Sequence, residues 1–534
     1  MISLFSFILS LLFLVSILVA VSRLFHKPQV HVLGAPSILG LPIVGNAFQL
    51  YHNPALTLSN WAQAVLLPVL LVHLGRMPVV VVSSFRMVRE LYANHSVGLS
   101  SRPLLHTFHT VVSAVQGVTV GSTPAGASFR RKKKCLSMQL SNVALHQSLV
   151  NAAVDHHSRM ALKHLLRFRL QVGCDCRTPL NDVSMLLPAQ HFVLGVAIDI
   201  TYGMTMDCER ADSELTASII ATENQIIRTR ALFANYQDYL PFLSRWPFSW
   251  IFSSKPQFWR DRRDAYMRRL YNDFEHRLLM NDPQAVRSML GRILSNPKVS
   301  ISASEIQSIC LTMVSAGLDN SALTFDHLMG QLSHQHGYVM QEKLYSSLIN
   351  LYDGDMVVAW HQVAISSDCN YALALISEAM RYFTVLPLGL PRLTTKKIIC
   401  NGVTIPENTV VVMNAFAANH DPDQFHNPNE FNPDRWLNED EMINTKMSHL
   451  TFGLGSRKCS GDKLAIRDLY TLLCRTILLF EVRRPADGKY HMKLNPFEGN
   501  LCLTATSFEP TEFRVWLRPR EGPQVPELHA IVLK

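Results

Sequence analysis

A ten-residue segment near the C-terminus, residues 452–461, constrains this chain more than any other. It reads Phe-Gly-Leu-Gly-Ser-Arg-Lys-Cys-Ser-Gly, so glycines surround one cysteine and two cations precede it. Glycine lets the backbone take left-handed turns and approach a flat ligand closely. The neighbouring Arg457 and Lys458 favour the thiolate of Cys459, which is the form that ligates metals. A helical pattern follows, and a helix N-terminus beside Cys459 also favours negative charge.

A buried structural cysteine in a glycine-rich turn is the alternative, but the pattern Phe-x-x-Gly-x-Arg-x-Cys-x-Gly is specific enough to favour a ligand. With this pattern the chain resembles the haem-thiolate monooxygenases, the cytochrome P-450 family. The resemblance implies that Cys459 is the axial ligand of haem b iron, a ligand type that favours O–O cleavage. It also implies that Phe452 leads the loop in beside the cofactor and that Arg457 pairs with a haem carboxylate.

A long helix is predicted from the capping box Ser302-Ala-Ser-Glu305 to about Gly337. Its middle carries Ala-Gly-Leu-Asp-Asn-Ser at residues 316–321. The resemblance implies that small residues here lie against the cofactor and that Asp319 begins a proton path. Relatives follow this acid with a threonine, whereas this chain has Asn320, and an amide is a poor proton relay. Asn320 therefore leaves a second function open, that of a haem-thiolate enzyme that inserts no oxygen and instead couples rings, dehydrates or isomerises its substrate.

Two more motifs follow in the order that the family shows. Glu378 and Arg381 share one helical face because they are three residues apart. The resemblance implies that they form a buried network with Arg435 of Phe-Asn-Pro-Asp-Arg-Trp, which holds the cysteine loop. Arg392 stands where relatives place a further haem propionate partner.

The basic run at residues 130–134, Arg-Arg-Lys-Lys-Lys, is either a solvated helix face or a functional cluster. The resemblance implies that Arg131 reaches a haem propionate. The other cations, with Lys458, would face an acidic reductase that delivers electrons from NADPH. A tryptophan that usually precedes this run in relatives is replaced by Ala125.

The first 22 residues predict an uncleaved transmembrane anchor, because residues 2–22 are apolar or hydroxyl-bearing and uncharged. A cleaved signal peptide is the alternative, but its cations normally precede the apolar run. Here they follow it, which retains the chain in the cytosol. A proline- and glycine-spaced hinge (residues 23–50) and a catalytic domain (residues 51–534) complete a single-pass protein of the endoplasmic reticulum membrane.

Composition agrees with a folded enzyme, since 48% of residues are hydrophobic and 17% charged. The net charge of +9 accompanies no nucleic-acid-binding signature, and irregularly spaced cysteines predict no disulfide framework. We expect a mainly α fold with a small β region. Its hairpins span residues 69–82 and 398–410, the second turned at Asn401-Gly402. Residues 501–516 predict a further strand pair, whose turn reaches back to the pocket.

These features predict a membrane-anchored monooxygenase that oxidises an apolar or aromatic small molecule, in specialised metabolism. Three segments resemble fungal phenylacetate hydroxylases: Ser-Arg-Pro at 101–103, Ala-Gly-Leu-Asp at 316–319 and Phe-Thr-Val-Leu-Pro at 383–387. A non-catalytic haem or ligand binder is the other alternative. The identity of the substrate stays open.

Overall fold

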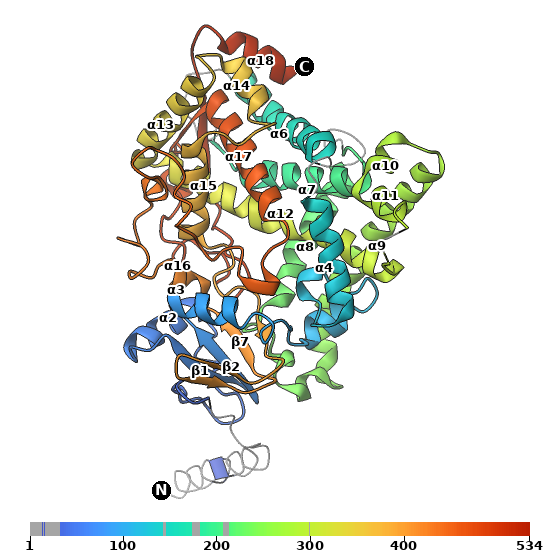
Figure 1. Cartoon of the computed structure of the whole chain (residues 1–534), viewed down its shortest axis with the longest axis vertical. Helices are drawn as coiled ribbons and strands as arrows, with labels where there is room; N and C mark the ends of the chain where they lie inside the picture. The colour runs from blue at the N-terminus through green and yellow to red at the C-terminus, as the bar shows by residue number, and fades with distance from the viewer. Residues whose placement is uncertain are drawn as a thin grey trace, which may run out of the picture.

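The protein is described by a computed structural model that covers residues 13, 15–16, 32–141, 146–172, 182–206, 213–297 and 300–534. It is mainly helical with a small β component, as the sequence predicts, and the largest of its three small sheets lies at one end (Figure 1). The α-helices are α2 (Pro54–Ala64), α3 (Phe85–Arg89), α4 (Ala127–Leu140), α6 (Asn151–Val172), α7 (Leu186–Tyr202), α8 (Ser213–Ile226), α9 (Phe248–Leu279), α10 (Pro283–Arg287), α11 (Met289–Leu294), α12 (Ala303–Ser333), α13 (Gln335–Leu351), α14 (Met356–Gln362), α15 (Asn370–Phe383), α16 (Ala415–Asn419), α17 (Asp462–Leu479) and α18 (Val525–Leu533). The strands are β1 (Val69–Leu74), β2 (Met77–Val82), β3 (Asp182–Val183), β4 (Arg392–Leu393), β5 (Ile398–Cys400), β6 (Val403–Ile405), β7 (Val410–Met413), β8 (Phe480–Arg483) and β9 (Val515–Pro519).

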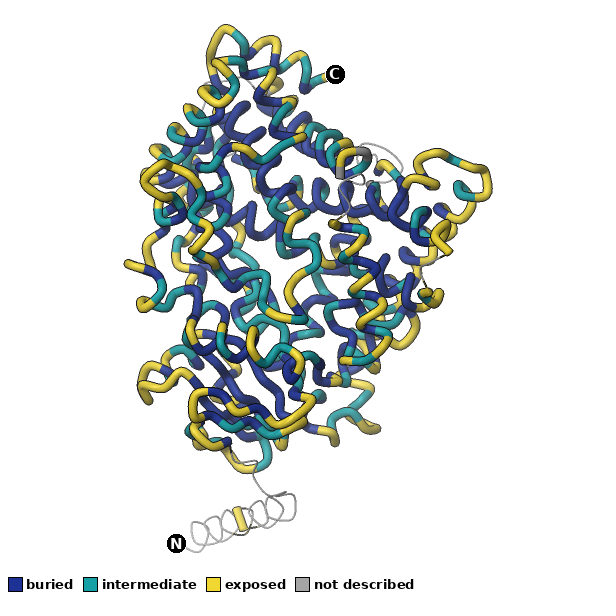
Figure 2. The backbone as a smooth tube through the Cα atoms, in the orientation of Figure 1, coloured by how far each residue is buried: buried dark blue, intermediate teal, exposed yellow. Residues whose placement is uncertain are grey.

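Helix α12 runs through the middle of the helical part and is buried along most of its length (Figures 1 and 2). The predicted capping box is present, with Ser302 Oγ accepting from the Glu305 amide. The 31 residues of α12 span about 46 Å at 1.5 Å per residue. The helix ends four residues before the predicted Gly337, because His334 adopts an extended conformation that separates α12 from α13.

The largest sheet has the strand order β1-β2-β7-β4. β1 and β2 form the predicted antiparallel hairpin, and β2 runs parallel to β7, with Val79 opposite Val410. Valines fill β2 and β7, as expected for strands buried on both faces. β5 and β6 form the second predicted hairpin. Its turn residues Asn401 and Gly402 both have positive φ angles (49° and 77°), which that turn requires.

The C-terminal tail differs from its prediction. Residues 501–516 form no strand pair, and a single bridge joins Asn500 to Pro510. The strand β9 begins only at Val515 and pairs with β8 and β3. Phe508 at the predicted turn packs against Phe383 and Val385 in a separate apolar cluster, so apolar packing, not strand pairing, fixes this turn.

The predicted membrane anchor, residues 1–22, lies outside the described residues apart from Phe13, Val15 and Ser16. Among the described residues, the structure contains no helix with both the length and the apolar character that crossing a membrane requires.

Helices α6 and α7 approach each other closely at Gly195, and this contact yields a stability prediction. A Cβ atom at Gly195 would lie 2.4 Å from Nδ1 of the buried His157 on α6. Overpacking of this kind costs about 1–3 kcal/mol, partly offset by about 1 kcal/mol of helix propensity. Gly195→Ala should therefore lower the free energy of unfolding by up to about 2 kcal/mol, measured by urea denaturation. Gly488→Ala is the control, because its Cβ would meet no atom within 4 Å; equal effects of both changes would contradict the prediction.

Candidate active site

The cysteine loop between β7 and α17 is shaped by its glycines. Gly453 and Gly455 both have φ angles of +65°, a region that other residues resist. A Cβ at Gly455 would also lie 2.4 Å from the Tyr92 carbonyl oxygen. The Cys459 amide donates to the Phe452 carbonyl (2.9 Å), which closes the loop into a compact turn.

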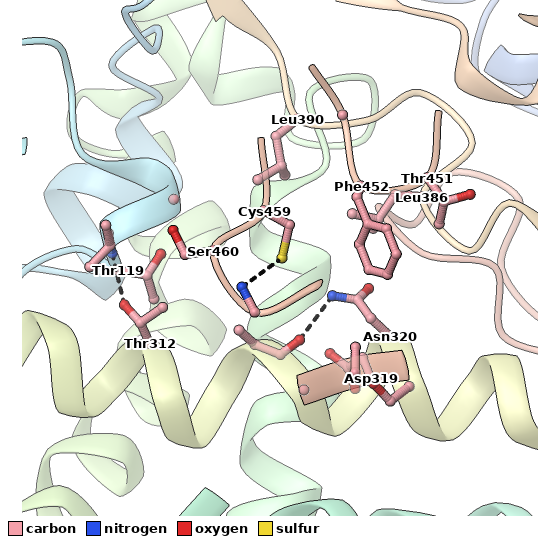
Figure 3. A pocket seen from close by; sticks show the side chains of 18 of the residues that line it. Thr119, Thr312, Asp319, Asn320, Leu386, Leu390, Thr451, Phe452, Cys459 and Ser460 are labelled. Carbon is pink, nitrogen blue, oxygen red and sulfur yellow. Dashed lines mark hydrogen bonds between the residues drawn. The ribbon is translucent and has the colours of Figure 1, made fainter. Parts of the chain in front are cut away.

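The thiol of Cys459 faces a cavity of about 310 Å³ between this loop and α12 (Figure 3). Its Sγ accepts a hydrogen bond from the Gly461 amide (3.3 Å), immediately before α17 begins. Burial raises the pKa of the Cys459 thiol, while the Gly461 amide and the cations Lys133 and Lys458 lower it. Lys458 and the Gly461 amide at the start of α17 thus favour the thiolate, the direction the sequence predicts, but burial raises the pKa by more than they lower it. A bound metal ion would deprotonate such a thiol outright.

Helix α12 forms the wall that faces the cysteine loop. Ala316, Gly317, Asp319 and Asn320 line the cavity, as the sequence predicts for this segment. Asn320 Nδ2 donates to the Ala316 carbonyl (2.9 Å), so the amide is held by its own helix. Its buried Oδ1 has no hydrogen-bond partner within the described part of the chain. An acceptor without a donor partner is left free to bind a ligand or water in the cavity.

Asp319 is buried, and its carboxyl group has an unusual pKa. Burial raises the pKa of Asp319 to about 7, with Glu223 and Glu509 adding to the rise. Arg230 and Arg228 lower this pKa but do not offset the burial. At neutral pH the carboxyl group is therefore partly protonated and can donate a proton as well as accept one.

Four cations gather at the part of the cavity between β4, α4 and the cysteine loop: Arg102, Lys133, Arg392 and Arg457. No carboxylate of the described residues forms an ion pair with any of them. Burial lowers the pKa values of Lys133, Arg392 and Arg457 to about 8, 10 and 9. Burial also lowers the pKa of Arg102, with Arg392 and Arg457 adding to the decrease. A buried cluster of like charges without counter-charge is unfavourable unless an anion binds there.

Backbone carbonyl groups hold these arginines in place. Arg457 Nε donates to Ser100 O (2.6 Å), and Arg392 Nη2 donates to Leu454 O (2.7 Å). Both Nη atoms of Arg457 and Nη1 of Arg392 are buried and have no hydrogen-bond partner among the described residues. Arg102 is fixed by the carbonyl groups of Gly121, Leu390 and Pro391. The guanidinium groups are thus oriented, with donors left for a ligand.

Arg131, predicted to reach a haem propionate, lies elsewhere. It pairs with Glu305 at the start of α12 (2.8 Å) and does not line the cavity. Lys133, two residues further along α4, takes that place, because a shift of two residues turns a helical side chain to another face. Its Nζ donates to the carbonyl groups of Ser456 and Lys458. Only the position of α4 relative to the cysteine loop decides which cation of the run points inward.

In the sequence Arg102 belongs only to the Ser-Arg-Pro segment that resembles the phenylacetate hydroxylases, and Arg230 belongs to no motif. Arg230 follows α8 in the 3₁₀ turn η6 (Ile227–Arg230) and lines the cavity. A lone arginine at the end of a helix carries no sequence signal for such a place.

The structure brings Glu378, Arg381 and Arg435 together in a buried network. Arg381 donates to both carboxylate oxygens of Glu378 (2.8 Å each), and Arg435 Nε donates to the same carboxylate (3.2 Å). Trp436 Nε1 and the backbone amide of Asn432 also donate to the Glu378 carboxylate (2.9 Å each). Glu378 and Arg381 are fully buried, so no water substitutes for these partners.

Hydrogen bonds lead from this network to the cysteine loop. Arg381 Nη1 donates to the backbone carbonyl group of Asn419 (2.9 Å). The side-chain Oδ1 of Asn419 in turn accepts a hydrogen bond from the Leu450 amide (2.9 Å). Thr451 Oγ1 donates to the carbonyl group of Met380, next to Arg381 (2.8 Å). The start of the loop is therefore fixed to α15 on two sides.

Comparison with known proteins agrees with this geometry. The family model for cytochrome P450 matches residues 36–509. Phenylacetate 2-hydroxylase of Emericella nidulans is 32% identical over 501 residues, covering 93% of each chain. The 3-hydroxyphenylacetate 6-hydroxylase of the same organism is 30% identical, covering 96% of this chain and 94% of its own. A cytochrome P450 monooxygenase of Mycosarcoma maydis is also 30% identical, over 516 residues.

The cavity fits haem, the cofactor of that family. Haem offers one metal ion and two carboxylates, and the cavity offers one accessible thiol and four cations without counter-charge. The free donors of Arg392 and Arg457 match carboxylate oxygens, which accept paired hydrogen bonds from guanidinium groups. Arg392, Arg457 and Lys133 would hold the propionates, and Cys459 the iron.

The Glu378 network generates a stability prediction. Glu378→Gln removes the negative charge that two buried arginines share, which costs about 3–5 kcal/mol. We expect a correspondingly lower free energy of unfolding, measured by urea denaturation of the haem-loaded protein. Glu430→Gln makes the same chemical change at an exposed side chain of the segment that carries Arg435, and it should cost almost no free energy of unfolding. Two variants of equal stability would contradict the role of the network.

The raised pKa of Asp319 generates a pH prediction. In the unfolded chain this carboxyl group ionises near pH 4, whereas in the folded protein it ionises near pH 7. As pH rises between these values the unfolded state is favoured, by up to about 1.4 kcal/mol per pH unit. The free energy of unfolding of native protein should thus fall more steeply between about pH 5 and 7 than that of Asp319→Asn. The same change at the exposed Asp353 should leave the native slope intact; parallel native and Asp319→Asn curves would refute the assignment.

Proposed function

The chain belongs to the cytochrome P450 family, and from this premise we propose that it hydroxylates a small aromatic acid of the arylacetate type. As a member of the family it is a monooxygenase with haem iron that receives electrons from a reductase. The two relatives from Emericella nidulans are named for hydroxylation of phenylacetate and of 3-hydroxyphenylacetate. The observation that carries the proposal is the accessible Cys459 thiol and the four uncompensated cations in one cavity, opposite an α12 wall of small residues.

In the proposed site Cys459 binds the haem iron as a thiolate. Bound haem supplies the activation of dioxygen and the insertion of one oxygen atom into the substrate. The Gly461 amide holds Sγ in position, and the Phe452 carbonyl fixes the Cys459 backbone. Arg392, Arg457 and Lys133 would hold the propionates of a haem bound in this cavity, between the cysteine loop and α12.

Asp319 supplies protons to the α12 side of the cavity, which its pKa of about 7 suits. Asn320 cannot relay them through a hydroxyl, but Ser321 and Thr324 also line the cavity and carry one each. Asn320 is also the observation that favours a second candidate, a haem-thiolate enzyme that inserts no oxygen. The ratio of hydroxylated product to NADPH consumed separates the two, because only in a monooxygenase does the amount of hydroxylated product rise together with the amount of NADPH consumed.

Residues 1–22 anchor the protein in the endoplasmic reticulum membrane with the catalytic domain in the cytosol. An exposed apolar surface near the hinge supports this proposal. Trp246 and Trp250 are 86% and 77% exposed, and Leu39 of the hinge is 89% exposed. Tyr51, next to the hinge, stacks on Tyr236 (6.4 Å between ring centroids), so the end of the hinge lies beside the segment that leads from η6 to Trp246 and Trp250. Amphipathic aromatic side chains suit the membrane interface.

An NADPH-dependent reductase docks on the face that surrounds the cysteine loop. Arg130, Lys134, Lys458 and Lys463 are exposed there, and Lys133 links α4 to the loop. Such a face attracts an acidic partner, and it lies on the side from which electrons reach Cys459. The product belongs to specialised metabolism in this proposal.

One experiment tests the proposed function. Native protein, purified with bound haem and reduced under carbon monoxide, should show the red-shifted band of thiolate ligation, and Cys459→Ala should not. With reductase and NADPH, native protein should hydroxylate phenylacetate or 3-hydroxyphenylacetate, detected by mass spectrometry. Persistence of the thiolate band in Cys459→Ala would overturn the assignment of the ligand. Absence of any hydroxylated product from these acids and their neutral amides would overturn the reaction.

A further inference from the structure

We infer that Arg230 is the specificity-determining residue of this cavity and binds the carboxylate of an acidic aromatic substrate. The inference rests on the proposed function and extends it, since it assigns the substrate class to one side chain. Arg230 ends the turn η6 and lines the same cavity as Cys459, Asp319 and Asn320.

The side chain of Arg230 is positioned but not paired. Its guanidinium carbon lies 4.5 Å from the centroid of the buried Phe108 ring, a cation–π contact that fixes the group from one side. Its Nε is buried and has no hydrogen-bond partner among the described residues. The other nitrogen atoms likewise make no hydrogen bond to the described part of the chain. Arg230 therefore keeps the donors that a carboxylate needs.

The neighbouring acids are already occupied by other arginines. Arg228 binds Glu509 through Nε and Nη2 (3.4 and 2.5 Å). Arg263 binds Glu223 in the same two-point manner (2.8 and 2.6 Å), with both side chains buried. Arg230 is the arginine of this group that has no acid of its own. Burial lowers the pKa of Arg230 to about 10, so the guanidinium still carries its charge at neutral pH.

Asp319 does not neutralise Arg230 fully. No ion pair within 4.0 Å joins them in the described structure, although each shifts the pKa of the other. With a pKa of about 7, Asp319 is partly neutral at physiological pH, which leaves net positive charge at Arg230. A substrate carboxylate at Arg230 would favour the protonated form of Asp319, the form that can donate a proton.

This cation is distinct from the four that fit the propionates. The groups whose charges shift the pKa of Arg230 are Arg263, Glu223, Asp319 and Tyr266, and none belongs to that cluster. Val193, Ala197 and Ile227 are among the apolar side chains that line the same cavity as Arg230. Apolar lining together with an oriented cation outside the propionate cluster suits an aromatic ring that carries a carboxylate.

The test compares an acid with its neutral isostere. Haem-loaded native protein, Arg230→Gln, Arg230→Lys and the control Arg228→Gln are titrated with phenylacetate and with phenylacetamide, by the substrate-induced change in the haem absorption spectrum. Equilibrium dialysis with labelled ligands measures the same dissociation constants if binding leaves the spectrum unchanged. Each variant is first checked for the thiolate band of the reduced carbon monoxide complex, which reports an intact fold and haem site.

Native protein should bind the acid more tightly than the amide. Arg230→Gln should weaken acid binding by about 10- to 100-fold and leave amide binding within about 2-fold, because a charge-assisted pair is lost. Arg230→Lys should retain an intermediate preference for the acid, and Arg228→Gln should match native protein, since Arg228 faces Glu509 and not the cavity.

Equal binding of acid and amide by native protein, or equal loss of both in Arg230→Gln, would overturn the inference. Failure of the proposed function looks different. If native protein hydroxylates phenylacetate and neutral aromatic compounds without preferring the acid, the proposed function stands and the assignment of Arg230 is wrong. If native protein lacks the thiolate band or forms no oxygenated product, the proposed function itself is wrong.

Discussion

The buried carboxylate of Glu378 connects the helical core to the loop that carries Cys459. It compensates Arg381 and Arg435 in a place that water does not reach, and its other hydrogen bonds come from Trp436 and the Asn432 amide. Through Arg381 and Asn419 the same network holds the residues that begin the cysteine loop. A loop with several left-handed glycines has little conformational preference of its own, so this external fixation determines where the thiol lies.

The cavity above that loop is organised by charge that the protein leaves uncompensated. Four cations surround the region that fits the propionates, and Arg230 stands alone on the α12 side. Each is held by carbonyl groups or by an aromatic ring, which orients a guanidinium without neutralising it. The free energy cost of unpaired buried charge is recovered when anions bind, so these cations favour the binding of anionic ligands. Asp319 adds the opposite case, an acid kept partly neutral by burial.

The differences between prediction and structure have two physical causes. Arg131 and Lys133 are cations of one helix but lie about 200° apart around its axis, so the orientation of α4 in the packed fold decides which of them faces the cavity. The tail pairs only through the bridge between Asn500 and Pro510, and the turn is held by Phe508, which packs against Phe383 and Val385 on elements distant in the chain. By contrast the capping box at Ser302 and the hairpin at Asn401-Gly402 depend on neighbours in sequence, and both are present as predicted.

The sequence by itself determined the family, the cysteine loop, the long helix with its acid and the local turns, because each depends on residue types at short spacing. Only the tertiary structure decided which cations enter the cavity, how the pKa of Asp319 is raised and that Arg230 lacks a partner. These properties depend on distances between elements far apart in the chain: η6 meets α12 across almost one hundred residues, and α4 meets the cysteine loop across more than three hundred. Burial and charge compensation are properties of the packed whole, so no segment specifies them alone.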